Sequence, residues 1–120
     1  MPGREHWMAR MKPLGPRAQV AYRRTLSPAE VAALRAGLWP RDMDDRWIVY
    51  LGEDGLAMHR SWSGHCIYSV PASATSEGGL VLGPLFVSDD AASYRRQDDT
   101  KEIEMVDYLI DDTVNRIQKV

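Results

Sequence analysis

The 120-residue sequence has few of the features that mark common functional classes. It contains one cysteine, Cys66, which excludes an internal disulfide and a cysteine-based zinc site and favours a reducing compartment such as the cytoplasm. No apolar run approaches the ~20 residues that a membrane-spanning helix needs. The net charge of −2 gives no electrostatic reason to expect nucleic acid as a partner. We therefore predict a cytoplasmic protein that binds neither membranes nor nucleic acid.

Recognised catalytic motifs are also missing. The sequence has no G-x-S-x-G, H-E-x-x-H or C-x-x-C pattern and no phosphate-binding P-loop. Its three histidines are too few to favour a dedicated metal site, so we expect neither a metal nor a cofactor. Three carboxylates in "DMDD", residues 42–45, could hold a hard cation or act as a base, but such clusters more often form solvated turns or pair with arginine. Whether the protein is an enzyme stays an open question.

The two ends of the chain differ in pattern. Residues 1–25 hold six basic residues and three prolines without a sustained apolar period, which predicts a loose basic N-terminal arm. Residues 26–120 carry the periodic segments, and a chain of this length forms one domain. We expect residues 1–20 of the arm to be dispensable for the fold.

Two helices are predicted on either side of a set of strands. Ser27 is placed to cap a short helix, with Pro28 in its first position and Glu30 completing a capping box. Gly37 is a natural C-cap for that helix. A long helix is predicted over residues 100–118. Its apolar stripe consists of Ile103, Val106, Ile110, Val114 and Ile117.

The segment between the helices reads as short strands joined by tight turns. The predicted strands are residues 46–51, 56–62, 65–70 and 80–87, with a flexible loop at 72–79. Gly83-Pro84 favours a bend and an edge position for the last of them. Residues 46–51 are apolar on both faces, which predicts a central strand covered on both sides. The predicted fold is therefore α+β: an antiparallel β-meander of about four strands, with the long C-terminal helix on one face and a short N-terminal helix.

The stretch "MHRSWSGHCIY", residues 58–68, concentrates polar and aromatic side chains. Arg60 alternates with Leu56, Met58 and Trp62 on one predicted strand face, where an unpaired guanidinium is costly. One interpretation pairs Arg60 internally with Asp44, Asp45 or Glu53. The other gives it an anionic ligand, because guanidinium forks match phosphate or carboxylate and stack on indole.

The neighbours of Arg60 also allow two interpretations, a structural role or a role in ligand binding. Trp62 and Trp47 are either core residues or stacking platforms. The turn could supply hydrogen bonds to a ligand, or it could be ordinary turn and surface chemistry. The candidate ligand-binding residues are Arg60, Trp62, His59, Ser61, Ser63, His65 and Trp47. Cys66 is predicted to be a small buried residue rather than a nucleophile.

Between Asp42 and Tyr68 the chain resembles a family of small bacterial domains of uncharacterised function. That family has an "MDD-[KR]-W" segment, a short hairpin and then "HRSW-[ST]-G-x-C-I-Y". The matching residues are Met43, Asp44, Asp45, Arg46 and Trp47, then His59, Arg60, Ser61, Trp62, Ser63, Gly64, Cys66, Ile67 and Tyr68. Such domains sometimes accompany ADP-ribose-processing proteins, so the resemblance implies a link to NAD-derived nucleotides. It implies no catalytic residue.

Two functional hypotheses follow. The first is a binding module or small enzyme for a phosphate-bearing, nucleotide-like ligand such as ADP-ribose or another NAD derivative. In it Arg60 meets the phosphate and a tryptophan stacks on the base. The second is a protein-interaction module, an immunity or accessory subunit, whose aromatic sheet face contacts a partner or a second copy in a homodimer.

Overall fold

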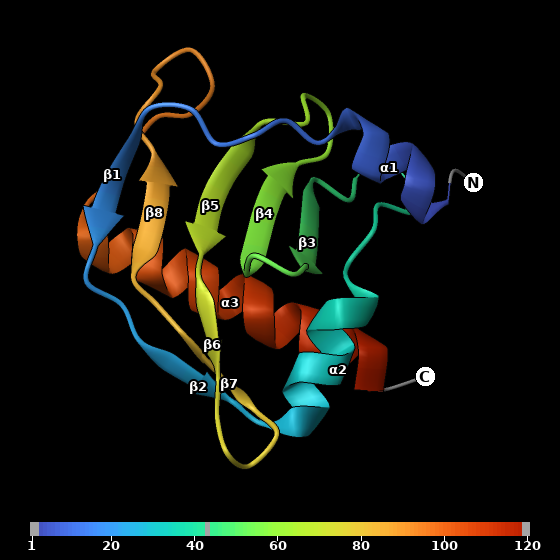
Figure 1. Cartoon of the computed structure of the whole chain (residues 1–120). Coiled ribbons are helices and arrows are strands. Elements are labelled where there is room, and N and C mark those ends of the chain that lie inside the picture. Colours follow the sequence, from blue (N-terminus) through green and yellow to red (C-terminus); the bar gives the residue numbers. More distant parts are fainter. Residues whose placement is uncertain (1–2, 43, 119–120) are drawn as a thin grey trace.

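A computed structural model of the chain describes residues 3–42 and 44–118. Over these residues the chain forms three helices and eight strands in two antiparallel sheets (Figure 1), which confirms the α+β class. The helices are α1 (Arg4–Arg10), α2 (Pro28–Ala36) and α3 (Asp99–Gln118). The strands are β1 (Arg17–Val20), β2 (Arg24–Leu26), β3 (Trp47–Leu51), β4 (Leu56–Arg60), β5 (Cys66–Val70), β6 (Ala72–Ala74), β7 (Leu80–Leu82) and β8 (Leu85–Ser88).

Three consecutive pairs of strands, β1–β2, β5–β6 and β7–β8, each contribute one strand to either sheet, and the chain bends between the two strands of a pair. The larger sheet has the order β1-β8-β5-β4-β3 and the smaller one β2-β7-β6. The predicted strand 80–87 is therefore split at the Gly83-Pro84 bend into β7 and β8. Gly83 is required there, because its φ is +140° and a Cβ would lie 2.2 Å from the carbonyl oxygen of Tyr22.

The core lies between the five-stranded sheet and α3, which crosses behind that sheet in Figure 1. The predicted stripe is confirmed, since Val106, Ile110 and Val114 are buried and Ile103 and Ile117 are partly buried against the same core. On the sheet side the buried residues include Val49, Leu51, Leu56, Met58, Tyr68, Val70, Leu85 and Val87. At ~25 cal/mol per Å² of apolar surface, this layer is the main source of stability.

Helix α2 has the predicted ends. The Ser27 side chain accepts a hydrogen bond from the Glu30 backbone N–H, the Glu30 side chain accepts one from the Ser27 N–H, and Gly37 is the C-cap. Directly after the helix, Leu38 exchanges backbone hydrogen bonds with Val49 of β3. This contact covers the outer edge of the sheet.

Two predicted strand positions are wrong. β3 is the edge strand of the large sheet, not a central one, and β8 lies inside the sheet between β1 and β5. The two apolar faces of β3 are buried, with Ile48 and Val49 both inaccessible to solvent. A strand can be buried on both faces without being hydrogen-bonded to a neighbour on both edges. The prediction inferred a central position from facial burial alone.

The N-terminal 25 residues differ from the loose arm predicted for them. Among those that the structure describes, Arg4–Arg10 is helical and Arg17–Val20 pairs with β8, from Arg17 opposite Ser88 to Val20 opposite Leu85. A four-residue strand with one buried position has too short a pattern to be seen in the sequence. β6, which occupies the start of the predicted loop 72–79, has only three residues and is likewise too short to be recognised from its sequence pattern. None of the described helices combines the length and apolarity that a membrane crossing requires.

Candidate functional site

The hairpin of β3 and β4 places Arg60 beside Trp47. The two residues are opposite each other in the strand register, so their side chains share one sheet face. The Arg60 guanidinium carbon lies 4.5 Å from the centre of the Trp47 ring. This is a cation–π contact, which stabilises the charge and fixes the plane of the guanidinium without using its N–H donors.

The internal ion pair considered for Arg60 is not formed. Within the described part of the chain its guanidinium has no ion pair or hydrogen bond, and neither has that of Arg46. Asp45, the nearest acidic residue in sequence to Arg46, is bound instead by Arg41 at 3.2 Å and Arg116 at 3.5 Å. The donors of Arg46 and Arg60 are therefore available to a ligand.

Arg46 and Arg60 line one pocket, of about 270 Å³, together with Trp62 and Ser63. Trp62 is 62 % exposed, although a tryptophan is usually largely buried. The structure thus brings Arg60, Trp62 and Ser63 together, as the ligand hypothesis requires. We call this group of four residues the arginine pocket. Arg46 was not predicted as a site residue, although the "MDDRW" segment that contains it was noted as part of a motif.

Trp47 does not serve as an open platform in the arginine pocket. Its ring is stacked on that of Tyr68, with centroids 5.9 Å apart and an interplanar angle of 17°, and it also carries Arg60. Contacts with both groups leave little of the indole for a ligand base. Trp47 instead connects the pocket to the core and holds Arg60 in place.

Below the stacked side chains of Arg60, Trp47 and Tyr68 lies the buried carboxylate of Glu102, which the sequence analysis did not single out. The Tyr68 hydroxyl donates to Oε1 of Glu102 at 2.8 Å, and the Tyr94 hydroxyl donates to the same oxygen. The Gln97 backbone N–H donates to Oε2 at 3.3 Å, and Glu102 is fully buried. Burial, and then the hydrogen bonds to Tyr94 and Glu102, raise the pKa of Tyr68, so the phenol stays protonated. From the sequence, Glu102 has only its place in the first helical turn to mark it.

His59 and Ser61 lie inside the turn rather than in the pocket, and both are buried. The His59 Nδ1 lies 3.0 Å from the Gly64 carbonyl oxygen, which can only accept, so Nδ1 carries the proton. Burial lowers the pKa of His59. The Ser61 hydroxyl donates to the Asp45 carbonyl at 2.8 Å. Both side chains shape the turn and are not available to a ligand in this conformation.

Ser63 and His65 close the turn. The Ser63 hydroxyl oxygen accepts a hydrogen bond from the His65 backbone N–H at 3.2 Å. Ser63 also lines the arginine pocket, whereas His65 is partly buried and does not line it. Of the seven predicted residues, three line this pocket, Trp47 supports it, and His59, Ser61 and His65 build the turn next to it.

The N-terminal segment fastens this turn to the domain. The Lys12 backbone N–H donates to the Gly64 carbonyl at 2.9 Å, and Nη2 of Arg10 donates to the Trp62 carbonyl at 2.9 Å. Gly64 has a φ of +79°, and a Cβ there would lie 2.1 Å from the Arg10 carbonyl oxygen. Only glycine fits this position. The segment predicted to be a loose arm therefore holds the wall of the pocket.

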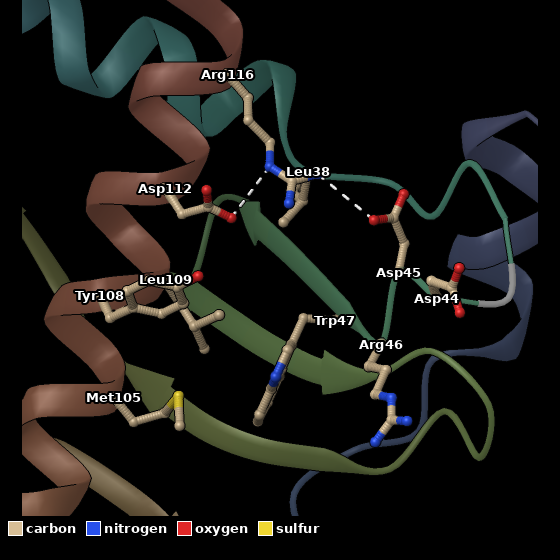
Figure 2. A pocket seen from close by; sticks show the side chains of 10 residues that line it. All are labelled: Leu38, Asp44, Asp45, Arg46, Trp47, Met105, Tyr108, Leu109, Asp112 and Arg116. Atoms are coloured by element: carbon tan, nitrogen blue, oxygen red, sulfur yellow. Dashed lines mark hydrogen bonds and ion pairs between the residues drawn. The ribbon is translucent and has the colours of Figure 1, made fainter.

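A second pocket of about 290 Å³ shares Arg46 with the first and lies between α3 and the start of β3 (Figure 2). Its walls include Trp47, Met105 and Tyr108 and the carboxylates of Asp44, Asp45 and Asp112. We call it the α3 pocket. Arg116 binds Asp45 and, at 3.1 Å, Asp112.

The carboxylates of the α3 pocket are in different states. A hydrogen bond from the Arg41 backbone N–H, with the Arg41 and Arg116 charges, lowers the pKa of Asp45. Asp44 is exposed, and its carboxylate has no ion pair or hydrogen bond from any residue that the structure describes. Over the same residues, no group of three or more His, Cys, Asp or Glu side chains is placed to hold a metal ion.

Comparison with known proteins assigns no relative. No protein-family model, no curated protein and no solved structure matches the chain. Function is therefore argued from the chemistry of the two pockets.

Proposed function

We propose that the protein binds a phosphate-bearing, nucleotide-like ligand in the arginine pocket. The observation that carries the proposal is the pair Arg46 and Arg60, two guanidinium groups on the walls of one pocket without a carboxylate partner in the described structure. A protein of net charge −2 and seventeen acidic residues has many carboxylates that could neutralise them. Arginines kept apart from those carboxylates are typical of an anion site.

Phosphate is the anion that fits this arrangement best. A guanidinium offers parallel N–H donors that bind two phosphate oxygens at once, and two guanidiniums can bind one phosphate or two adjacent ones. The stacking of Arg60 on Trp47 reduces the side-chain entropy that binding would cost. At the rim of the pocket, the Ser63 hydroxyl supplies a hydrogen bond to the ligand. The exposed Trp62 ring supplies an apolar surface there.

A ligand titration tests the proposal. Pyrophosphate, ADP, ADP-ribose and NAD are titrated into the full chain by calorimetry, and melting curves are recorded at the same concentrations. A ligand present at 100 times its dissociation constant should stabilise the fold by about 2.7 kcal/mol. We expect at least one of these compounds to bind and to lose roughly tenfold or more in affinity with Arg60→Ala or Arg46→Ala.

The control for these variants is Arg35→Ala, because Arg35 is exposed on α2 and lines neither pocket. It should bind like the unmodified chain. If none of the four compounds shifts the melting temperature, the nucleotide proposal is wrong. The exposed Trp62 and Tyr108 would then favour the interaction hypothesis, and the mass of the protein in solution would be the next measurement.

A further inference from the structure

We infer that the α3 pocket is the second half of the same binding site and takes the nucleoside part of the ligand, so that the ligand class is a ribonucleoside diphosphate rather than a free phosphate. The inference rests on the proposed function of the arginine pocket. It is carried by the position of the two pockets, which share Arg46 as a wall and are linked by the contact of Arg60 in one with Trp47 in the other.

Size is the first argument. Pockets that bury most of a small organic ligand span ~300–1,000 Å³. The arginine pocket has about 270 Å³ and the α3 pocket about 290 Å³, so each alone lies at the lower end of this range. The two together fall within the range. A ligand with a compact anionic end and a larger neutral end uses both.

The second argument is the division of charge. The α3 pocket has three carboxylates on its walls and two guanidiniums, those of Arg116 and of the shared Arg46, whereas no carboxylate is among the described residues that line the arginine pocket. Arg116 pairs with Asp45 and Asp112, and Asp44 has no ion pair among the described residues, so three carboxylates against two guanidiniums leave the walls with one net negative charge. A phosphate is therefore repelled from the α3 pocket, while an uncharged group with hydrogen-bond donors is accepted there.

The third argument is the chemistry of the walls. Figure 2 shows Met105 and Tyr108 projecting from α3 on one side and Asp44 and Arg46 on the other, with Trp47 between them. Tyr108 is 61 % exposed, and its ring can cover the face of a planar base. The Asp44 carboxylate can accept hydrogen bonds from the two hydroxyls of a ribose. An aromatic surface and an acceptor beside a diphosphate site match a ribonucleoside.

The test compares ligands that differ by one part at a time. Pyrophosphate, ADP, GDP, UDP and the 2′-deoxy form of the tightest nucleotide are titrated by calorimetry into the full chain. They are also titrated into Asp44→Ala and Tyr108→Ala. Both residues are exposed, so the fold should be kept, and melting curves verify it. Asp54→Ala, an exposed carboxylate in the β3–β4 turn that lines neither pocket, is the matched control.

We expect the best nucleoside diphosphate to bind at least about tenfold more tightly than pyrophosphate and to lose severalfold in affinity without its 2′-hydroxyl. Asp44→Ala and Tyr108→Ala should each weaken the nucleotide by roughly tenfold and leave pyrophosphate unchanged. Equal affinities for nucleotides and pyrophosphate would overturn the inference and leave the arginine pocket as a phosphate site. If pyrophosphate and all nucleotides fail to bind, the proposed function is wrong and the inference fails with it.

Discussion

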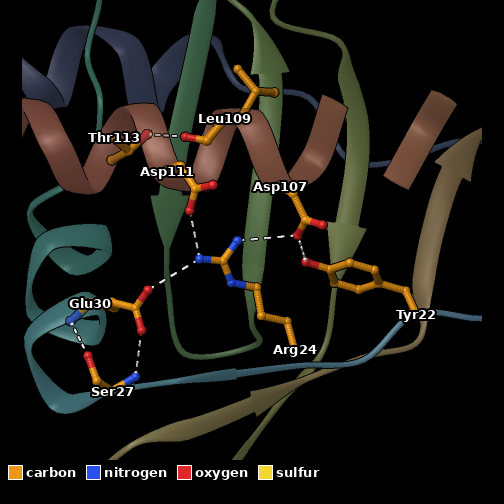
Figure 3. A network of polar contacts seen from close by, with 8 residues as sticks. All are labelled: Tyr22, Arg24, Ser27, Glu30, Asp107, Leu109, Asp111 and Thr113. Carbon is orange, nitrogen blue, oxygen red and sulfur yellow. Dashed lines mark hydrogen bonds and ion pairs between the residues drawn. The ribbon is translucent and has the colours of Figure 1, made fainter. Parts of the chain in front are cut away.

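Two arginines of this protein, Arg24 and Arg60, are both only partly exposed and have opposite surroundings. Arg24 of β2 lies among three carboxylates (Figure 3): Glu30 of α2 at 3.2 Å, and Asp107 and Asp111 of α3 at 3.2 and 2.8 Å. Arg60 of β4 contacts the Trp47 ring and has no carboxylate partner among the described residues. The first arginine is satisfied by the fold, and the second still has its donors free.

Under the proposed function, the same residue type serves the fold at Arg24 and ligand binding at Arg60. The network of Arg24 joins β2, α2 and α3, and Tyr22 adds a hydrogen bond of 2.6 Å to Asp107. The Arg24 side chain is 22 % exposed and forms ion pairs with three carboxylates, which favours one arrangement of β2, α2 and α3 over others. Arg60, by contrast, has the Trp47 ring as its internal contact and no carboxylate partner among the described residues, which is why we propose a ligand role for it.

The largest expected effect is on stability at the Arg24 network. Arg24→Ala leaves Glu30, Asp107 and Asp111 close together without a cation, which should cost about 2–3 kcal/mol once solvent screening is allowed for. Urea unfolding measures the loss. Arg35→Ala removes an exposed arginine that has no ion pair in the described structure and should change stability by less than about 0.5 kcal/mol. Equal losses for the two variants would mean that the network is not structural.

The second effect concerns the turn that carries Trp62 and Ser63. Gly64→Ala places a methyl group 2.1 Å from the Arg10 carbonyl oxygen at a φ of +79°, and we expect a loss of about 2 kcal/mol. Gly15→Ala is the matched control, because a Cβ there meets nothing within 4 Å. The loss shows in the melting temperature. If Gly64→Ala had the same melting temperature as the unmodified chain, the N-terminal segment would not pack on the turn.

The third effect tests the support beneath Arg60. Tyr68→Phe keeps the ring under Trp47 but removes the hydroxyl that donates to buried Glu102. A buried carboxylate with one donor fewer should cost about 1–2 kcal/mol. Tyr50→Phe is the control, since the Tyr50 hydroxyl has no hydrogen bond in the part of the chain that the structure describes. Denaturant midpoints that are equal for the two variants would contradict the stated role of Glu102.

The smallest effect is a pH dependence from His59. Burial holds its pKa below the ordinary value of about 6.5, so the unfolded chain takes up a proton that the folded chain does not. Stability should therefore be insensitive to this group above about pH 7 and should fall as the pH drops below about 6.5. His59→Asn should flatten that decline between pH 7 and pH 5.5, measured by urea unfolding. An unchanged decline would mean that other groups cause it.

The predictable parts of the fold are those whose signal is local. The capping box of α2 and the apolar stripe of α3 are explicit in the sequence and are found as predicted. β1 and β6 are three or four residues long, and their pairing partners decide their conformation. For the same reason the edge position of β3 and the internal position of β8 could not be read from apolar pattern alone.

The candidate site divides in the same way. Strand alternation correctly put Arg60 on the face of the sheet with Met58, and the structure adds that Trp47 lies opposite it on the neighbouring strand. Whether Arg60 has an internal partner depends on where Asp44, Asp45 and Glu53 lie in the fold, and Asp45 is bound by Arg41 and by Arg116 from α3. No local pattern contains that choice. The burial of His59 and Ser61 likewise depends on how the turn closes over Gly64, and they were grouped with the ligand residues on polarity alone.

The central claim is that Arg60 binds a ligand whereas Arg24 holds the fold, and substituting lysine at both positions tests it most directly. Lysine keeps the charge but loses the forked, stacking geometry. Melting curves and pyrophosphate and nucleotide titrations are recorded on Arg24→Lys and Arg60→Lys side by side. We predict that Arg24→Lys loses about 1–2 kcal/mol of stability and keeps its ligand affinity, while Arg60→Lys loses less than about 1 kcal/mol and roughly tenfold in affinity. An Arg60→Lys variant that is destabilised as much as Arg24→Lys and binds ligand like the unmodified chain would contradict the account.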